Sequence, residues 1–267
     1  MKFSPPLVPG RLLRRYKRFL ADVEISTTGE VITAHTANTG AMTGCCEPGS
    51  PVWLSLSSNV KRKYAYTWEL VQVENGNGGA LVGINTMLSN HLVREAIEHG
   101  VIHELQGYDN LRGEVKYGHE NSRIDLLLTK TGAELRDNTD SNAFESPSII
   151  DAVCYVEVKN VTLVEQNQAG KNQGEQKTAL FPDAVSKRGS KHLRELTAVV
   201  KQGGRAVIFY CVPRNDVFEM KPADAIDAEY GRLLRSAVSA GVEALAYTAE
   251  LSPGEIVLSK KIPVRLA

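Results

Sequence analysis

The sequence predicts a two-domain α+β protein, in which a small β-barrel or sandwich precedes an α/β domain with a mixed central sheet. The first 80 residues hold several short apolar runs and no helical period, which is typical of an all-β unit. From about residue 83, helical and strand-like segments alternate. The chain has 267 residues, of which 42% are hydrophobic, so it can bury two modest cores.

The predicted strands of the first domain are runs of branched and aromatic residues at Arg11–Ser26, Val31–Ala34, Val52–Ser57 and Ala65–Val73. Turn-forming residues lie between or after them, at Thr28–Gly29, Asn38–Gly40, Glu47–Gly49 and Asn75–Gly79. Because these strands are short and closely spaced, they favour a small barrel. We expect the domain boundary between residues 80 and 85.

Basic and aromatic side chains are interleaved in this first domain. The basic ones form two clusters: Arg11, Arg14, Arg15, Lys17 and Arg18, and then Lys61, Arg62 and Lys63. The aromatic ones are Tyr16, Phe19, Trp53, Tyr64, Tyr66 and Trp68. OB-type barrels hold single-stranded nucleic acid on basic grooves with stacking rings. Alternatively, the aromatics form the core and the charges protect a sheet edge; the sequence leaves both open.

The second domain begins with a predicted helix at Thr86–Ile97, with Thr86 as its N-cap and Gly100 as its stop. Strand-like segments follow at 113–117, 123–129 and 152–158, and the polar stretch 131–148 is expected to be an inserted hairpin or long loop. The remaining predicted elements are a helix at 186–201, a strand at Arg205–Val212, a helix near 224–240 and a strand at Glu243–Thr248.

Charge and cysteine content limit the class of protein. The net charge is zero, but residues 81–170 carry 7 basic and 14 acidic side chains, while residues 171–267 carry 15 and 11. An acidic centre beside basic flanks suits a metal site attended by phosphate-binding surfaces. The four cysteines show no CxxC spacing, and no apolar run reaches the ~20 residues of a membrane span. We therefore expect a cytoplasmic protein without a zinc site.

Three charged residues in predicted strands are the candidates for a catalytic metal site. Asp125 lies in the apolar run Arg123–Leu128, and Glu157 and Lys159 share one face of the strand Val153–Val158 and its continuation. Two carboxylates supply the oxygen ligands that Mg²⁺ prefers, and a lysine beside them can position or deprotonate water. The alternative is a structural ion pair, since Glu-x-Lys is common on exposed strands.

The order of these elements resembles the PD-(D/E)xK nuclease superfamily. Longer stretches are similar to the sugar fermentation stimulation protein A family: Gly10–Leu12, Ile84–Asn90, Val115–Gly118, Ser122–Asp125, Tyr155–Leu163 and Phe181–Leu193. The resemblance covers nearly the whole chain. It implies a bacterial or archaeal protein with an OB-like barrel over residues 1–82 and a restriction-endonuclease-like α/β domain over residues 83–267.

The resemblance also implies a site. Asp125 and Glu157 would hold Mg²⁺ or Mn²⁺, with the carbonyl of Val158 as a further ligand, and Lys159 would orient the attacking water. Glu114 is a further candidate acid, although an exposed strand carboxylate is its default interpretation. One departure is the long segment between Asp125 and Glu157: the site assembles only if residues 131–148 extend a hairpin.

Candidate nucleic-acid contacts come from both domains: Arg14, Arg15, Arg18, Lys61, Arg62, Arg188, Lys191 and His192. The last three lie with Glu195 on one face of the predicted helix 186–201, at helical spacing. DNA is favoured over RNA as the polymer, no membrane partner is expected, and a homodimer is compatible with the sequence. The family is described as DNA-binding and is named for an effect on sugar fermentation genes.

Three functions from different classes follow. The first is a Mg²⁺-dependent nuclease in which the barrel holds the strand. The second is a non-catalytic DNA-binding regulator of sugar (maltose) metabolism built on a nuclease scaffold, because a fold can outlive its chemistry. The third is an unrelated metal-binding or housekeeping role in which nucleic acid is incidental. The complete Asp, Glu and Lys set favours the nuclease, and the absence of a helix-turn-helix pattern argues against a sequence-reading transcription factor.

Overall fold

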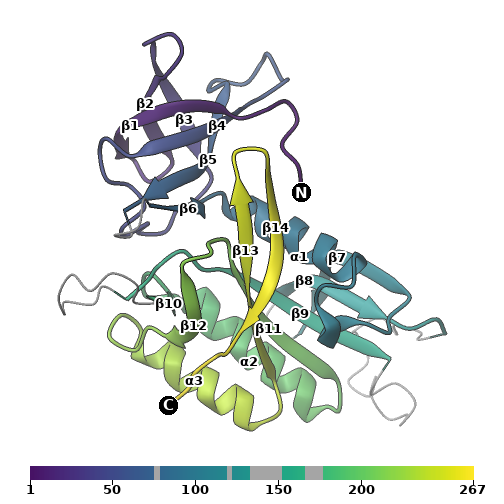
Figure 1. Cartoon of the computed structure of the whole chain (residues 1–267). Helices are drawn as coiled ribbons and strands as arrows, with labels where there is room; N and C mark the ends of the chain where they lie inside the picture. Colours follow the sequence, from purple (N-terminus) through teal and green to yellow (C-terminus); the bar gives the residue numbers. More distant parts are fainter. Residues whose placement is uncertain (75–78, 119–121, 133–151, 166–176) are drawn as a thin grey trace.

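A computed structural model of the chain describes residues 1–74, 79–118, 122–132, 152–165 and 177–267. These residues form a small β-barrel followed by a larger α/β domain with a mixed sheet, which confirms the predicted fold class (Figure 1). The predicted loop at 131–148 falls almost entirely outside the described residues. Among the helices of the described part, none is long and apolar enough to cross a membrane.

The N-terminal domain is a closed five-stranded barrel with one added strand. Its strands are β1 (Val8–Tyr16), β2 (Leu20–Ile25), β3 (Val31–Thr36), β4 (Pro51–Leu56), β5 (Tyr66–Val73) and β6 (Ala80–Gly83). They are ordered β3-β2-β1-β4-β5-β6, and a short parallel pairing between β3 and β5 closes the barrel. Alternate residues point inward, so that Leu12, Leu54 and Trp68 are fully buried in its core.

The prediction of one strand over Arg11–Ser26 is wrong, because β1 and β2 form an antiparallel hairpin that turns at Lys17 and Arg18. Both residues adopt positive φ, 49° and 63°. Tyr16 pairs with Leu20, so the turn has three residues, and left-handed positions of hairpin turns usually hold Gly, Asn or Asp. Two basic residues gave no such indication in the sequence.

The central sheet of the C-terminal domain has six strands in the order β14-β13-β11-β9-β8-β7. Their bounds are β7 (Asn110–Tyr117), β8 (Ser122–Thr129), β9 (Val153–Asn160), β11 (Arg205–Val212), β13 (Glu243–Ser252) and β14 (Glu255–Ile262). The central strands β9, β11 and β13 run parallel, whereas the outer pairings are antiparallel. The nearly continuous apolar sequences of β9 and β11 fit strands that are covered on both faces.

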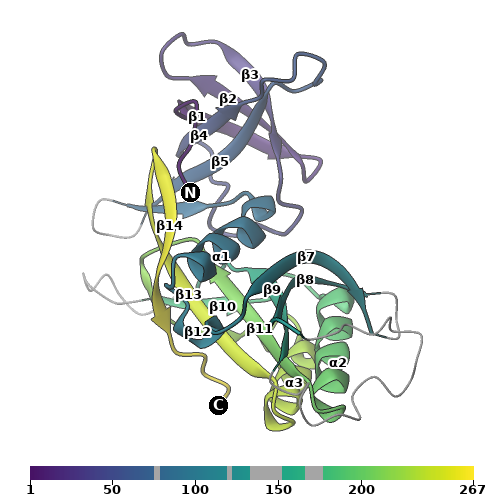
Figure 2. The ribbon, with the colours of Figure 1, turned by 90° about the vertical axis from the view of Figure 1, so that its right-hand side faces the viewer.

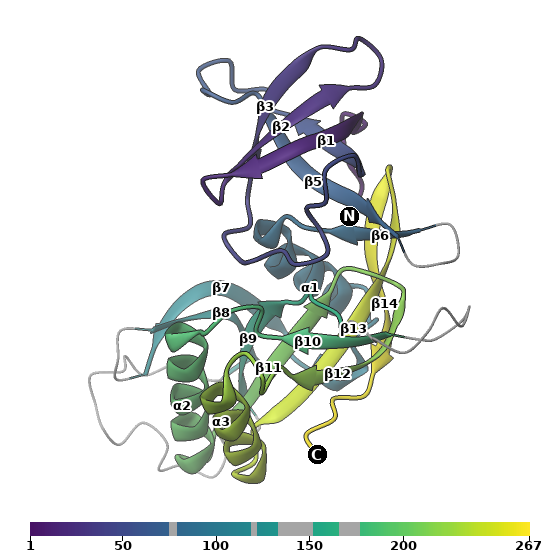
Figure 3. The same cartoon turned by 90° about the vertical axis from the view of Figure 1, so that its left-hand side faces the viewer.

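Helices cover both faces of this sheet (Figures 2 and 3). Helix α1 (Ser89–Glu98) packs Leu92, Val93 and Ala96 against one face, beside Val156 and Phe209. On the opposite face, α2 (Lys187–Lys201) and α3 (Ala228–Ser239) pack against the alternate residues of the same strands. The sheet is therefore the middle layer of three. The helices cover its faces but not the ends of its strands, where a functional site can form.

Several elements were not predicted. These are β6, β14, the short 3₁₀ turns at Thr86–Leu88 and His103–Leu105, and the parallel pair of β10 (Lys177–Phe181) with β12 (Val217–Pro222). Thr86 is not the N-cap of α1, since the helix begins at Ser89 without a side-chain cap. Instead, the side chain of Asn85 caps the preceding turn by accepting a hydrogen bond from the Met87 N–H at 3.0 Å.

Candidate active site at the domain junction

The site begins where β8 and β9 separate. Their antiparallel ladder runs from Thr129 and Val153 to Leu126 and Val156 and then stops. Asp125, the next residue of β8, takes over the hydrogen bonding: its Oδ2 accepts from the Val158 N–H at 2.7 Å. Its Oδ1 accepts from the Asn90 side chain on α1 at 2.9 Å. The carboxylate is thus held between α1 and the end of β9.

Glu157 and Lys159 lie side by side on β9, as their spacing predicts. Lys159 Nζ donates to Glu157 Oε1 at 2.5 Å. His192 of α2 also contacts this oxygen through Nδ1, and lies 3.1 Å from Lys159 Nζ. Glu157 is only 1% exposed, yet its second oxygen, Oε2, has no hydrogen-bond partner among the described residues. An unpartnered carboxylate oxygen in this position is costly unless something else binds it.

The two carboxylates differ in acidity. Burial raises the pKa of Asp125 above its ordinary value, and the nearby charge of Glu157 raises it further. Burial also acts to raise the pKa of Glu157, but the hydrogen bond with His192 and the charge of Lys159 outweigh it, so that this pKa is lowered. The pair therefore carries mutual repulsion that a bound cation would relieve.

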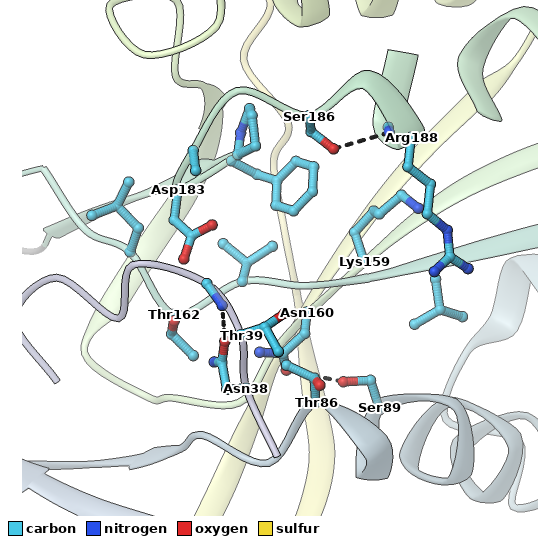
Figure 4. A pocket seen from close by; sticks show the side chains of 18 of the residues that line it. Asn38, Thr39, Thr86, Ser89, Lys159, Asn160, Thr162, Asp183, Ser186 and Arg188 are labelled. Carbon is cyan, nitrogen blue, oxygen red and sulfur yellow. Dashed lines mark hydrogen bonds between the residues drawn. The ribbon is translucent and has the colours of Figure 1, made fainter. Parts of the chain in front are cut away.

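These residues line a cavity of about 490 Å³ between the barrel and the α/β domain. The barrel contributes the loop Asn38–Gly40, and the rest comes from the start of α1, the ends of β8 and β9, and the segment leading into α2. In Figure 4, Lys159 and Arg188 lie on one side of this pocket, Asp183 lies on the other, and Asn160 lies between them.

The donor set fits a hard divalent cation. Asp125, Glu157 and Val158 all line the pocket, and two carboxylates completed by water or substrate oxygens suit Mg²⁺. Within the described residues, no group of three or more His, Cys, Asp or Glu side chains could hold a metal. Mg²⁺ is usually bound through one or two carboxylates, so the pair Asp125 and Glu157 is enough for it.

The predicted residues of the C-terminal domain fall into two sets. The pocket brings together Glu114, Asp125, Glu157, Val158, Lys159 and Arg188. Glu114 is exposed and has a positive φ of 56°, so it leaves the regular pairing of β7 opposite Asp125. Lys191 does not line the pocket, and His192 is 4% exposed, placed against Glu157 rather than on the surface of α2.

The predicted basic residues of the barrel do not line this pocket. Arg14 pairs with Asp22 at 2.8 Å and stays largely exposed, while Arg18, Lys61 and Arg62 are exposed. Arg15 is half-buried, and its guanidinium donates to backbone carbonyls of the loop that forms the barrel side of the pocket. The aromatics divide between the two alternatives, since Trp68 is fully buried and Phe19 is 47% exposed.

Sequence reasoning missed several polar residues of the pocket. Asn90 orients Asp125, and Ser89 donates to the Asn160 side chain at 2.9 Å. Asp183 approaches the barrel loop closely enough that a Cβ at Gly40 would lie 2.2 Å from its carboxylate. The stretches Ile84–Asn90 and Phe181–Leu193, which carry the family resemblance, contain three of these residues and were the available indication.

Comparison with known proteins gives a consistent result. A family model described as the sugar fermentation stimulation protein RE domain matches residues 87–255, and one described as the SfsA N-terminal OB domain matches residues 13–84. A sugar fermentation stimulation protein homolog of Geobacter sulfurreducens is 54% identical over 259 residues, 97% of this chain and 96% of that protein. A homolog of Thioalkalivibrio sulfidiphilus is 52% identical over 267 residues, 100% of this chain and 99% of that protein.

A solved structure is also similar. It is the structure of Pyrococcus furiosus SfsA in complex with Ca²⁺, which has 26% sequence identity and a TM-score of 0.77. The match covers 99% of this chain and 98% of that one. Both the barrel and the mixed-sheet domain are therefore shared.

Proposed function

We propose that this chain, which belongs to the sugar fermentation stimulation protein family, is a DNA-binding, Mg²⁺-dependent nuclease. The observation that carries the proposal is the buried Oε2 of Glu157, which has no hydrogen-bond partner in the described part of the chain and lies beside the carboxylate of Asp125 and the ammonium of Lys159. A purely structural ion pair has no use for a buried acceptor that is left without a donor.

Asp125, Glu157 and the Val158 carbonyl would hold the cation, which we expect to be Mg²⁺ or Mn²⁺. When bound, such an ion polarises the phosphate and lowers the pKa of its bound water. The relative from Pyrococcus furiosus was solved with Ca²⁺, which supports a site for hard divalent cations in this fold. No other metal chemistry is needed for the proposal.

The residues of the chain have separate roles in this proposal. Lys159 lies at the pocket, hydrogen-bonded to Glu157, where it can orient water and stabilise negative charge on the phosphate. Asn90 and the Val158 N–H fix the Asp125 carboxylate. Arg188, at the first turn of α2, faces the pocket and is suited to a neighbouring phosphate.

A cleavage assay tests the proposal. Single- and double-stranded DNA and RNA are incubated with the protein in Mg²⁺, Mn²⁺ or EDTA. We expect metal-dependent cleavage, at least about 100-fold slower in Asp125→Asn and in Glu157→Ala. Asp125→Asn keeps an oxygen for the Val158 N–H, and Glu250→Gln, at an exposed position of β13, is the matched control. Unchanged cleavage in both site variants would refute the assignment.

One observation favours the second candidate, a non-catalytic DNA-binding regulator of sugar metabolism. Glu157 Oε1 already has two partners, Lys159 and His192, so half of this carboxylate is satisfied without a metal. Tight DNA binding without cleavage of any polymer in any metal would exclude the nuclease and leave a non-catalytic DNA-binding protein.

A further inference from the structure

We propose that the pocket binds one unstacked nucleotide, with its phosphate at Lys159 and its base at Asp183 and Asn160. The substrate class is then nucleic acid with unpaired bases, such as single strands or frayed ends, rather than an intact duplex. This inference rests on the proposed function and adds the part of the substrate that the site recognises.

The two basic side chains among the described residues that line the pocket lie at one end of it. Lys159 and Arg188 lie beside the carboxylate pair, and Asp183 lies across the pocket from them (Figure 4). A carboxylate repels a second phosphate, but it accepts hydrogen bonds from the amino groups of bases. The far end is therefore suited to a base, and the near end to the phosphate that carries it.

The side-chain amide of Asn160 lines the same pocket. Its amide oxygen accepts from Ser89 Oγ at 2.9 Å, which leaves the amide NH₂ group without an acceptor among the described residues. Asn160 lines the pocket one residue after Lys159. A donor and an acceptor that flank an apolar wall, here Phe181 and Val161, can pair with the edge of a base.

Hydrogen bonds hold the barrel wall of this pocket. Arg15 donates to the carbonyls of Asn38 at 3.0 Å and Gly40 at 2.9 Å. Thr86 Oγ1 donates to the Ala37 carbonyl at 2.7 Å, which joins the barrel loop to the start of the α/β domain. A cavity of about 490 Å³ lies within the usual size range of a small-molecule site, and a single nucleotide is a ligand of that class.

The lips of the pocket carry exposed apolar side chains. Met87, before α1, is 76% exposed, and Val185, before α2, is 72% exposed, and both line the pocket. Nucleic-acid-binding proteins use exposed apolar residues as wedges that separate stacked bases. They are placed to divide the captured base from its neighbour.

The test uses oligonucleotides that contain one 2-aminopurine, as single strands and as blunt duplexes, with the full chain in Ca²⁺. Wild type is expected to bind the single strand at least about tenfold more tightly than the duplex, and the fluorescence of one captured 2-aminopurine should rise as it leaves its stack. Thr39→Trp, at an exposed position that lines the pocket, should abolish this rise and weaken binding about tenfold.

The matched control is Thr27→Trp, at an exposed position outside the pocket, which should behave as wild type. Met87→Ser should reduce the fluorescence rise, whereas Val257→Ser, on β14, should not. If wild type binds and cleaves but Thr39→Trp matches Thr27→Trp, the nucleotide pocket is refuted and the nuclease stands. If the duplex binds and is cut as well as the single strand, the pocket is also refuted. If wild type binds no nucleic acid, both proposals fail.

Discussion

Two clusters of buried charge in the α/β domain differ in how completely their hydrogen-bonding atoms are satisfied. In the first, Arg214 donates to both carboxylate oxygens of Asp216, at 2.6 Å and 2.8 Å, and to the Thr162 carbonyl. Lys177 adds a bond to Asp216 at 3.1 Å. In the second cluster, Glu157 binds Lys159 and His192 through one oxygen and leaves the other without a partner in the described chain.

The difference separates a structural ion pair from a candidate site. Burying a charge is expensive, and full hydrogen bonding is what makes it tolerable. The Arg214 cluster meets this condition with the protein alone, and it ties the segment after β9 to the loop between β11 and β12. The Glu157 cluster does not meet it and opens into the pocket, which is the pattern expected of a site that is completed by a cation.

The largest expected effect comes from breaking the satisfied cluster. Arg214→Met should lower the free energy of unfolding by about 3–5 kcal/mol, because Asp216 keeps its charge and loses its bidentate partner. Urea denaturation at pH 7 measures this. The control is Arg232→Met, which breaks an exposed ion pair with Glu229 and should cost less than about 1 kcal/mol. Equal losses in both variants would show that the buried pair does not contribute as described.

A smaller effect should come from filling the unsatisfied cluster. Ca²⁺ or Mg²⁺ at 100 times its dissociation constant should stabilise wild type by about 2.7 kcal/mol. For a chain of this size, that corresponds to a rise in Tm of roughly 5–10 °C. Asp125→Asn should lose the rise because it removes a carboxylate of the proposed site, and Asp216→Asn should keep it. A rise that survives in Asp125→Asn would place the cation elsewhere.

Acidity provides a third distinction. Burial acts to raise the pKa of Asp216, but hydrogen bonding to Arg214 and its charge outweigh burial and lower the pKa. Its contribution to stability is therefore complete above the ordinary Asp pKa of about 3.9 and is lost as pH falls through the lower folded value. For Asp125, whose pKa is raised by burial first, the sign is opposite: its charge destabilises the fold at neutral pH, and protonation relieves this.

Urea denaturation between pH 7 and pH 3 tests these signs. Asp216→Asn should be less stable than wild type at pH 7, and the gap should shrink only below about pH 4. Asp125→Asn should be at least as stable as wild type at pH 7, and any gain should disappear as acid protonates the wild-type carboxylate. Parallel stability curves for all three proteins would mean that neither carboxylate has a shifted pKa.

The sequence predicted the parts of the site that depend on strand alternation. Glu157 and Lys159 share a face because side chains alternate along any strand, and Asp125 lies opposite because it interrupts the apolar run Arg123–Leu128 in the neighbouring strand. It could not predict the polar end of the pocket. Asp183 and the Asn38–Gly40 loop meet only when the barrel docks on the α/β domain, and that docking leaves no periodicity in either segment.

The same limit applies to single side chains. Arg15 and Arg18 are indistinguishable within one basic cluster of the sequence, yet Arg15 donates to loop carbonyls while Arg18 is exposed in the hairpin turn. His192 is another case, because helical spacing placed it with Arg188 and Lys191 but did not indicate that it turns inward to Glu157. Sequence spacing shows which residues share a face of a helix. Whether one of these side chains is buried depends on how the helix packs against the sheet.

The smallest expected effect extends the comparison to these barrel arginines. In the double variant Arg14→Ala and Arg18→Ala, affinity for single-stranded DNA should fall severalfold. The slope of log K against log salt should become shallower by about 0.7 for each phosphate that the variant no longer neutralises. Arg15→Ala should change the slope less and instead slow cleavage, since its guanidinium supports the pocket wall. Fluorescence anisotropy titrations between about 50 and 200 mM salt give the slopes. An unaltered slope in the double variant would remove the barrel hairpin from nucleic-acid binding, and would leave the pocket as the whole of the interface.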